Sequence, residues 1–202
     1  MRKQISVLLA LTLAITSFSG CMGNKPENIV DKFCASMIAF DEEAASQYTI
    51  DGKIDVNISY LESTTDDGIN IEPITNYIKE NASKITYEIG EVTTESDSAV
   101  VPVQFTFVDA SPIMIATVGD YISQALLLTL SGADEATIEA LIVTIFDEKV
   151  DTVDTTETTA NINFECEKVD GDWKIAPLSE EDQETLTAVL TCNITNAAES
   201  VF

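Results

Sequence analysis

The stretch Val101-Pro102-Val103-Gln104-Phe105-Thr106-Phe107 decides the fold class. Its apolar residues recur at every second position, which is the period of a β-strand with one buried face. Ile85 to Ile89 alternates in the same way, and polar residues from Thr94 to Ser98 separate the two runs like a turn. We therefore expect an antiparallel hairpin. Pro102 should mark a sheet edge or a bulge, because proline has no backbone N–H to donate to a neighbouring strand.

A second hairpin is predicted over about 155–177. Apolar residues alternate with polar ones from Ala160 to Cys166, and Trp173 and Ile175 resume the alternation. Asp170-Gly171 lies between the two runs and is typical of a tight hairpin turn. Ile54, Val56 and Ile58 also alternate with polar residues, which predicts a short additional strand.

Helices are predicted around these hairpins. Residues 26–47 have an apolar stripe of helical period, and Pro73 can open a shorter helix. Ser111-Pro112 predicts a helix start with a capping hydroxyl, followed by one apolar side comprising Met114, Val118, Ile122, Ala125 and Leu128. The stretch 131–134 resembles a capping box that opens a second helix, so a helical hairpin over about 112–148 should separate the two β-hairpins.

The end of the chain predicts one more helix. Ser179 and Asp182 have the spacing of a capping box, and we expect the residues after Asn193 to fray. These patterns together predict an α+β fold, with an N-terminal helix packed on a curved antiparallel sheet, an inserted helical hairpin and a C-terminal helix.

The N-terminal residues predict export and lipid attachment. Arg2 and Lys3 precede an apolar run from Ile5 to Phe18 that is too short for a comfortable membrane span. The ending Ser17-Phe18-Ser19-Gly20-Cys21 resembles the lipobox of bacterial lipoproteins. That resemblance implies cleavage before Cys21, lipid attachment to its sulfur and an extracytoplasmic, membrane-anchored protein. The alternative is a plain secretory signal followed by an incidental cysteine.

The composition excludes several classes of function. The predicted mature chain, residues 21–202, has eight basic residues against 35 acidic ones, a net charge of −27, and contains no His or Arg. Ser-His-Asp and Cys-His catalysis, imidazole metal sites and bidentate phosphate clamps therefore have no residues to use. So acidic a surface repels nucleic acid but suits a basic partner, although solubility alone would also account for it.

The three remaining cysteines are Cys34, Cys166 and Cys192, and no two have the spacing of a zinc or redox motif. Their odd number leaves two interpretations, buried free thiols or a single disulfide with one thiol left over. Calcium or magnesium could take oxygen ligands from Asp147, Asp151 and Asp154, or from Asp170 and Asp172, but neither group matches the spacing of a calcium loop. We predict no metal and no cofactor.

Lys168-Val169-Asp170-Gly171-Asp172-Trp173-Lys174-Ile175 resembles the last hairpin of nuclear transport factor 2-like domains, and Ile85 to Val108 resembles the preceding one. The resemblance covers about residues 26–177. It implies a cone-shaped α+β domain whose opening can hold a small ligand. The residues it places inside the cone are Tyr87, Phe105, Phe107, Phe164 and Trp173. The alternative is that these aromatic residues simply fill the core.

Two functions remain in view. The first is a non-enzymatic binding or scaffolding module of the cell envelope that contacts a small apolar ligand or a basic envelope protein. The second is an enzyme of the nuclear transport factor 2-like type, with Asp120 and Tyr121 as acid and base. Thr117, Asp120 and Gln124 share helical spacing, which favours a solvated stripe over a reactive site. We expect a signal peptide at 1–20, a tether at 21–25, the α+β domain at 26–178 and a C-terminal helix at 179–202.

Overall fold

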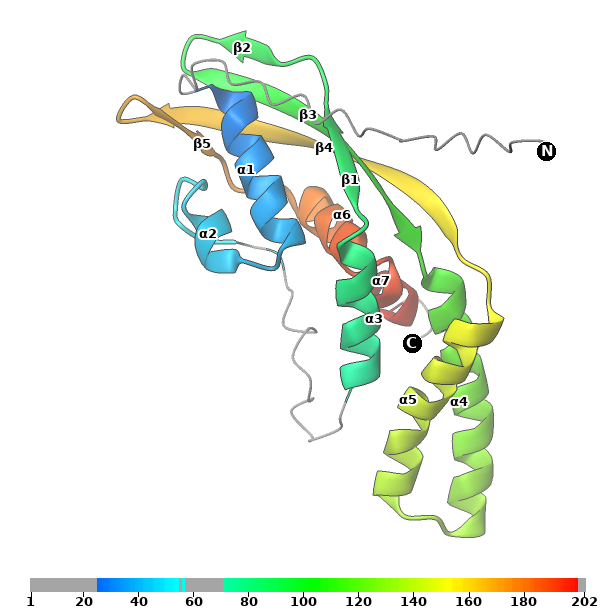
Figure 1. Ribbon diagram of the computed structural model, residues 1–202. Helices are drawn as coiled ribbons and strands as arrows, with labels where there is room; N and C mark the ends of the chain where they lie inside the picture. The colour runs from blue at the N-terminus through cyan, green and yellow to red at the C-terminus, as the bar shows by residue number, and fades with distance from the viewer. Residues whose placement is uncertain (1–24, 55, 57–70, 200–202) are drawn as a thin grey trace, which may run out of the picture.

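Two long strands form the centre of the sheet in the computed structural model, which describes residues 25–54, 56 and 71–199 (Figure 1). Strands β3 (Ser98–Asp109) and β4 (Thr156–Val169) pair over twelve positions, from Ser98 opposite Glu167 to Asp109 opposite Thr156. The sheet order is β1-β3-β4-β5, and β2 pairs with β3 beyond the end of β1. The four pairings between the described strands are antiparallel, as predicted, and a single parallel bridge joins Thr49 to Ile175 of β5.

The short strands complete the two predicted hairpins. β1 (Thr86–Ile89) and β2 (Thr93–Glu95) both pair with β3, so part of the predicted turn at 94–98 is strand. β5 (Asp172–Ile175) follows β4 through Asp170 and Gly171. Both turn residues have positive φ, 54° and 92°, as the tight hairpin turn requires.

Pro102 is not on an edge strand, because β3 has neighbours on both sides. Its ring lies where β1 has ended and β2 has not begun, and its carbonyl accepts a hydrogen bond from the N–H of Gly90 at 2.8 Å. The backbone nitrogen of Pro102, which carries no hydrogen, therefore lies where neither β1 nor β2 needs a hydrogen bond from β3. Gly90 leaves room for the ring, since a Cβ there would lie 3.1 Å from Pro102 Cγ.

One face of the curved sheet is covered by α1 (Pro26–Ile38) and α6 (Glu180–Leu190), and their contact forms the main core (Figure 1). The alternating residues of β3 and β4 supply its floor, including Val103, Phe105 and Phe164. The predicted N-terminal helix is shorter than expected. It ends before Phe40, whose φ of 56° breaks the helix, and α2 (Glu42–Ser46) begins after Asp41 caps it.

A second core lies beyond the end of the sheet. It joins α3 (Glu72–Ala82) to the predicted helical hairpin, formed by α4 (Ser111–Ser131) and α5 (Glu135–Thr152), and to α7 (Ile194–Glu199). Tyr77 and Phe146 meet there edge to face, with ring centroids 5.6 Å apart. Residues 194–199 were expected to fray, and that prediction is wrong because Ile194 and Ala197 are buried against this cluster.

The helix caps differ in detail from the sequence predictions. Ser111 is the first helical residue rather than the cap, and Asp109 accepts a hydrogen bond from its N–H at 3.0 Å. Asp134 itself caps α5 by accepting from the N–H of Thr137 at 2.8 Å. Ser179 caps α6 with Asp182, as predicted. Of the predicted short strand, residues 55, 57 and 58 lie outside the described residues, as does the lipobox.

Candidate functional site

The aromatic residues predicted for a cone pocket lie in the main core. Phe105 and Phe164 are fully buried, and Phe107 and Trp173 are nearly so. Phe164 packs edge to face against Phe33 of α1, with ring centroids 5.6 Å apart. A cleft next to Phe33 and Ile175 has room for about 10 Å³, which is enough for no more than one water molecule. The described side chains therefore fill this part of the main core.

Tyr87 is the fifth of these residues and is half-buried. Its hydroxyl donates to Asp31 of α1, at 2.8 Å from Oδ1 and 3.0 Å from the backbone oxygen. Burial, followed by the hydrogen bond to Asp31, raises the pKa of Tyr87 well above its usual value. The hydroxyl therefore stays protonated at neutral pH and ties β1 to α1.

Asp120 and Tyr121 do not form an acid–base site. The Asp120 carboxylate is half-exposed and pairs with Lys149 Nζ of α5 at 2.5 Å. This hydrogen bond raises the pKa of Lys149. The predicted solvated stripe is only partly correct, because Thr117 is completely buried and its hydroxyl donates to the carbonyl of Ile113.

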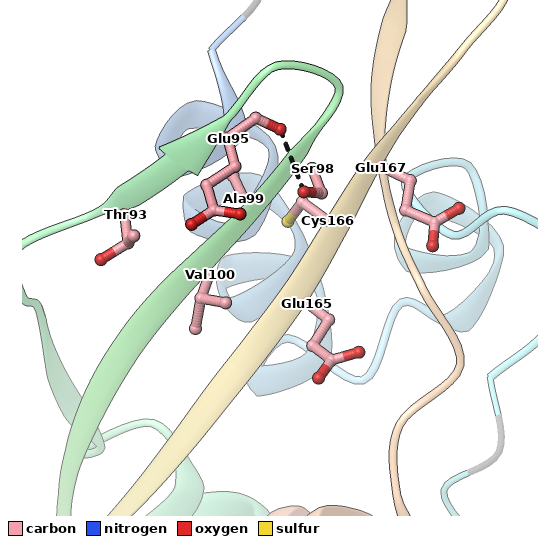
Figure 2. Close-up of a pocket in the computed structure, with 8 residues that line it drawn as sticks. All are labelled: Thr93, Glu95, Ser98, Ala99, Val100, Glu165, Cys166 and Glu167. Atoms are coloured by element: carbon pink, nitrogen blue, oxygen red, sulfur yellow. Dashed lines mark hydrogen bonds between the residues drawn. The ribbon is translucent and has the colours of Figure 1, made fainter.

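A groove lies where β2 turns into β3, beside β4, and has a volume of about 360 Å³ (Figure 2). Its polar lining includes Glu95, Glu165 and Glu167, and Ser98 Oγ donates to the carbonyl of Glu95 at 3.1 Å. No basic residue lines this groove, which makes it unsuited to anions. Among residues 25–54, 56 and 71–199, no group of three His, Cys, Asp or Glu side chains is placed to hold a metal ion.

The three described cysteines are free and buried, which is one of the two interpretations that the sequence left open. Burial raises the pKa of Cys166 to about 12 and that of Cys192 to about 11, and the pKa of Cys34 is also raised, mainly by burial. Thiols of this kind are poor nucleophiles at neutral pH.

The most unusual surface is one that the sequence patterns did not single out. Five large apolar side chains of α4 are about half-exposed or more, and we call them the α4 outer face: Ile115, Ile122, Leu126, Leu127 and Leu130. Leu127 is 66% exposed and Leu130 is 77% exposed. Ile122 was predicted on the buried side of the helix, but it is 49% exposed. Exposed apolar side chains grouped on one element are typical of interaction sites.

Within the described part of the chain, α4 is also the one helix that is long and apolar enough to cross a membrane by length and composition, with a mean hydropathy of 1.5. Asp120 and Gln124 do not lower its hydropathy enough to exclude this. Only 22% of the apolar stretch of α4 is buried in the fold, so α4 is not an ordinary core helix. Its first turns pack in the second core, and its remaining length lies beside α5 (Figure 1).

Comparison with known proteins found no matching family model, no similar curated protein and no similar solved structure. The α+β class is as predicted, whereas membership of the nuclear transport factor 2-like family remains a prediction that rests on the hairpin motif.

Proposed function

We propose that this protein is an extracytoplasmic lipoprotein, anchored at Cys21, that acts as a non-enzymatic binding or scaffolding module and makes its contact through the α4 outer face. The anchor is supported by the lipobox at 17–21. The observation that carries the binding role is the exposure of five large apolar side chains on one helix. Water contact with such a surface is unfavourable, and a partner that covers it gains that free energy.

The enzymatic alternative has less support. It requires an unpaired carboxyl group in an apolar pocket, and Asp120 is half-exposed and paired with Lys149. A small apolar ligand inside the cone also has less support, because Phe105, Phe107, Phe164 and Trp173 are packed in the main core. A contact made on the outside of the molecule agrees with both observations.

Two measurements test this function. Labelling cells with a radioactive fatty acid should label the wild-type protein and not Cys21→Ser, and label retained in Cys21→Ser would contradict the anchor. For the binding role, the variant L126E/L130E places carboxylates on the α4 outer face. It should lose the cross-linked products that the wild type forms with its binding partner when intact envelopes are treated with a chemical cross-linker. Val100→Glu is the matched control, because Val100 is an exposed apolar residue on β3, away from α4. Identical cross-linked products from all three proteins would contradict the binding role.

A further inference from the structure

The α4 helix carries large apolar side chains on the side that faces the protein and also on the side that faces solvent, although Asp120 and Gln124 interrupt them. Ile113, Met114 and Val118 are buried in the second core, while Ile115, Ile122 and Leu126 point into solvent. An apolar side of a helix is normally covered by other apolar groups. The first side of α4 is covered by the protein itself, so the α4 outer face is the side whose cover is missing.

Four of the five exposed residues, all except Leu127, follow one line along the helix. Ile115, Ile122, Leu126 and Leu130 are separated by seven, four and four positions, which keeps them on one side at 3.6 residues per turn. Gly119 lies on the same line, four residues after Ile115. A Cβ at Gly119 would meet nothing within 4 Å, so the line contains an open gap between bulky side chains.

The charge on α4 limits which kind of partner can bind this row of apolar side chains. The whole chain has a net charge of −25, yet α4 contains a single side chain that is charged at neutral pH, Asp120, and Lys149 pairs with it. A basic partner would find no carboxylate here to pair with. A second copy, which is repelled by most of this acidic chain, meets no uncompensated charge on this helix.

The line is also complementary to itself. If two α4 helices run antiparallel with a two-fold axis between Ile122 and Ser123, Ile115 of each copy lies opposite Leu130 of the other. Leu126 then lies opposite the gap at Gly119. Large side chains that fit into gaps are the general form of helix packing, and a two-fold axis requires such self-complementarity.

We propose, on the basis of the binding role above, that the α4 outer face is covered by a second copy of this chain, in an antiparallel pairing that places Leu126 of one copy over Gly119 of the other. The five side chains expose on the order of 600 Å² of apolar surface, close to the roughly 800 Å² per partner of a standard interface. The sides of the α4–α5 hairpin in each copy would supply the remaining interface area.

The anchoring bilayer suits this surface less well. The start of α1 lies at the opposite end of the molecule from the tip of the α4–α5 hairpin (Figure 1). The predicted tether, residues 21–25, reaches at most about 18 Å. The anchor therefore holds the end of the molecule that is far from the exposed leucines.

The test measures molecular mass by sedimentation, with the chain lacking residues 1–20 and carrying Cys21→Ser, which keeps every described element. The wild type and Val100→Glu should sediment as dimers. L126E/L130E should raise the dissociation constant at least about 100-fold, because the interface would desolvate carboxylates. A wild type that is monomeric at about 100 µM overturns the inference.

Gly119→Leu distinguishes the possible partners. Its side chain has open space in the single chain, and replacing glycine in a helix favours folding, so the variant should fold. It fills the gap that Leu126 of the copy needs and should weaken the dimer at least tenfold. If the α4 outer face instead binds lipid, the same change adds apolar surface and should strengthen binding to neutral lipid vesicles. A stronger dimer overturns the antiparallel pairing, and stronger vesicle binding by a monomer overturns the second copy in favour of lipid.

A cross-link on native membranes tests the register with the lipidated protein. The variant G119C/L126C should form a disulfide-linked dimer on oxidation, whereas Gly119→Cys and Leu126→Cys alone should form much less. Equal yields from all three overturn the register. If the wild type is monomeric but cross-links through α4 to another envelope component, the second copy is excluded and the binding role stands. If the wild type contacts nothing through α4, both the pairing with a second copy and the proposed binding role are wrong.

Discussion

We predict that Phe164→Ala lowers the free energy of unfolding by about 4 kcal/mol, within the range measured for large aromatic residues truncated in a core. Phe164 is fully buried on β4, and its ring packs edge to face against Phe33 with centroids 5.6 Å apart. Part of the loss, about 1 kcal/mol, belongs to this ring pair. A double-mutant cycle with Phe33→Ala isolates that part.

Urea unfolding followed by tryptophan fluorescence measures the effect. The chain contains one tryptophan, Trp173, which is buried on β5 in the same core, so its emission reports on this part of the fold. Val100→Ala is the control, because Val100 is 39% exposed on the other face of β3 and should change stability by less than about 0.5 kcal/mol.

The outcome separates the two interpretations of the aromatic residues. A core residue leaves a cavity when it is truncated, and the surrounding side chains relax only in part. A residue that lines an open, solvated pocket loses much less. A loss below about 1 kcal/mol for Phe164→Ala would refute the filled core and restore the ligand pocket that the family resemblance implies.

Three further predictions concern side chains around the two cores. Burial alone would raise the pKa of Asp109, but hydrogen bonds from Ser111 and Asn193 outweigh it and lower the pKa. Asp109→Ala should therefore lower the free energy of unfolding by about 1 kcal/mol at pH 7. In urea titrations this difference from the wild type should disappear as the pH falls below about 4, because Asp109 is then protonated in both the folded and the unfolded chain. A difference that grows in acid would contradict the lowered pKa. Tyr87→Phe removes the hydrogen bond to Asp31 and should cost about 1 kcal/mol in the same assay, whereas an unchanged midpoint would mean that the bond contributes nothing. A thiol reagent at pH 8 should leave the three buried cysteines of the Cys21→Ser chain unmodified until urea unfolds it, and rapid labelling of the folded chain would contradict their burial.

The strands were the most predictable part of this fold. The alternation at 101–107 and 160–166 survives in the structure because one face of each strand is buried and the other is wet. The turn at Asp170-Gly171 was also predictable from its chemistry. The break after α1 was not, because the apolar stripe continues across Phe40, whose left-handed conformation is held by packing between the two cores.

The α4 outer face shows where periodicity stops being informative. A stripe of apolar residues locates the buried side of a helix only when the opposite side is polar. In α4 both sides are apolar, so Ile122 was assigned to the core side although it faces solvent. The signal that could have found this surface was the near absence of charged residues over 111–131 in so acidic a chain.

The α4–α5 hairpin joins Asp109 and Thr156, which lie directly opposite each other on β3 and β4. The segment 110–155 therefore leaves and re-enters the sheet at a single pair of opposed residues. Paired insertions or deletions of whole helical turns in the two helices would move the tip outward or inward without shifting a single strand residue. Related chains can therefore vary in length at this hairpin while retaining the same sheet, and a reporter sequence placed at Gly132 would be carried far from both cores.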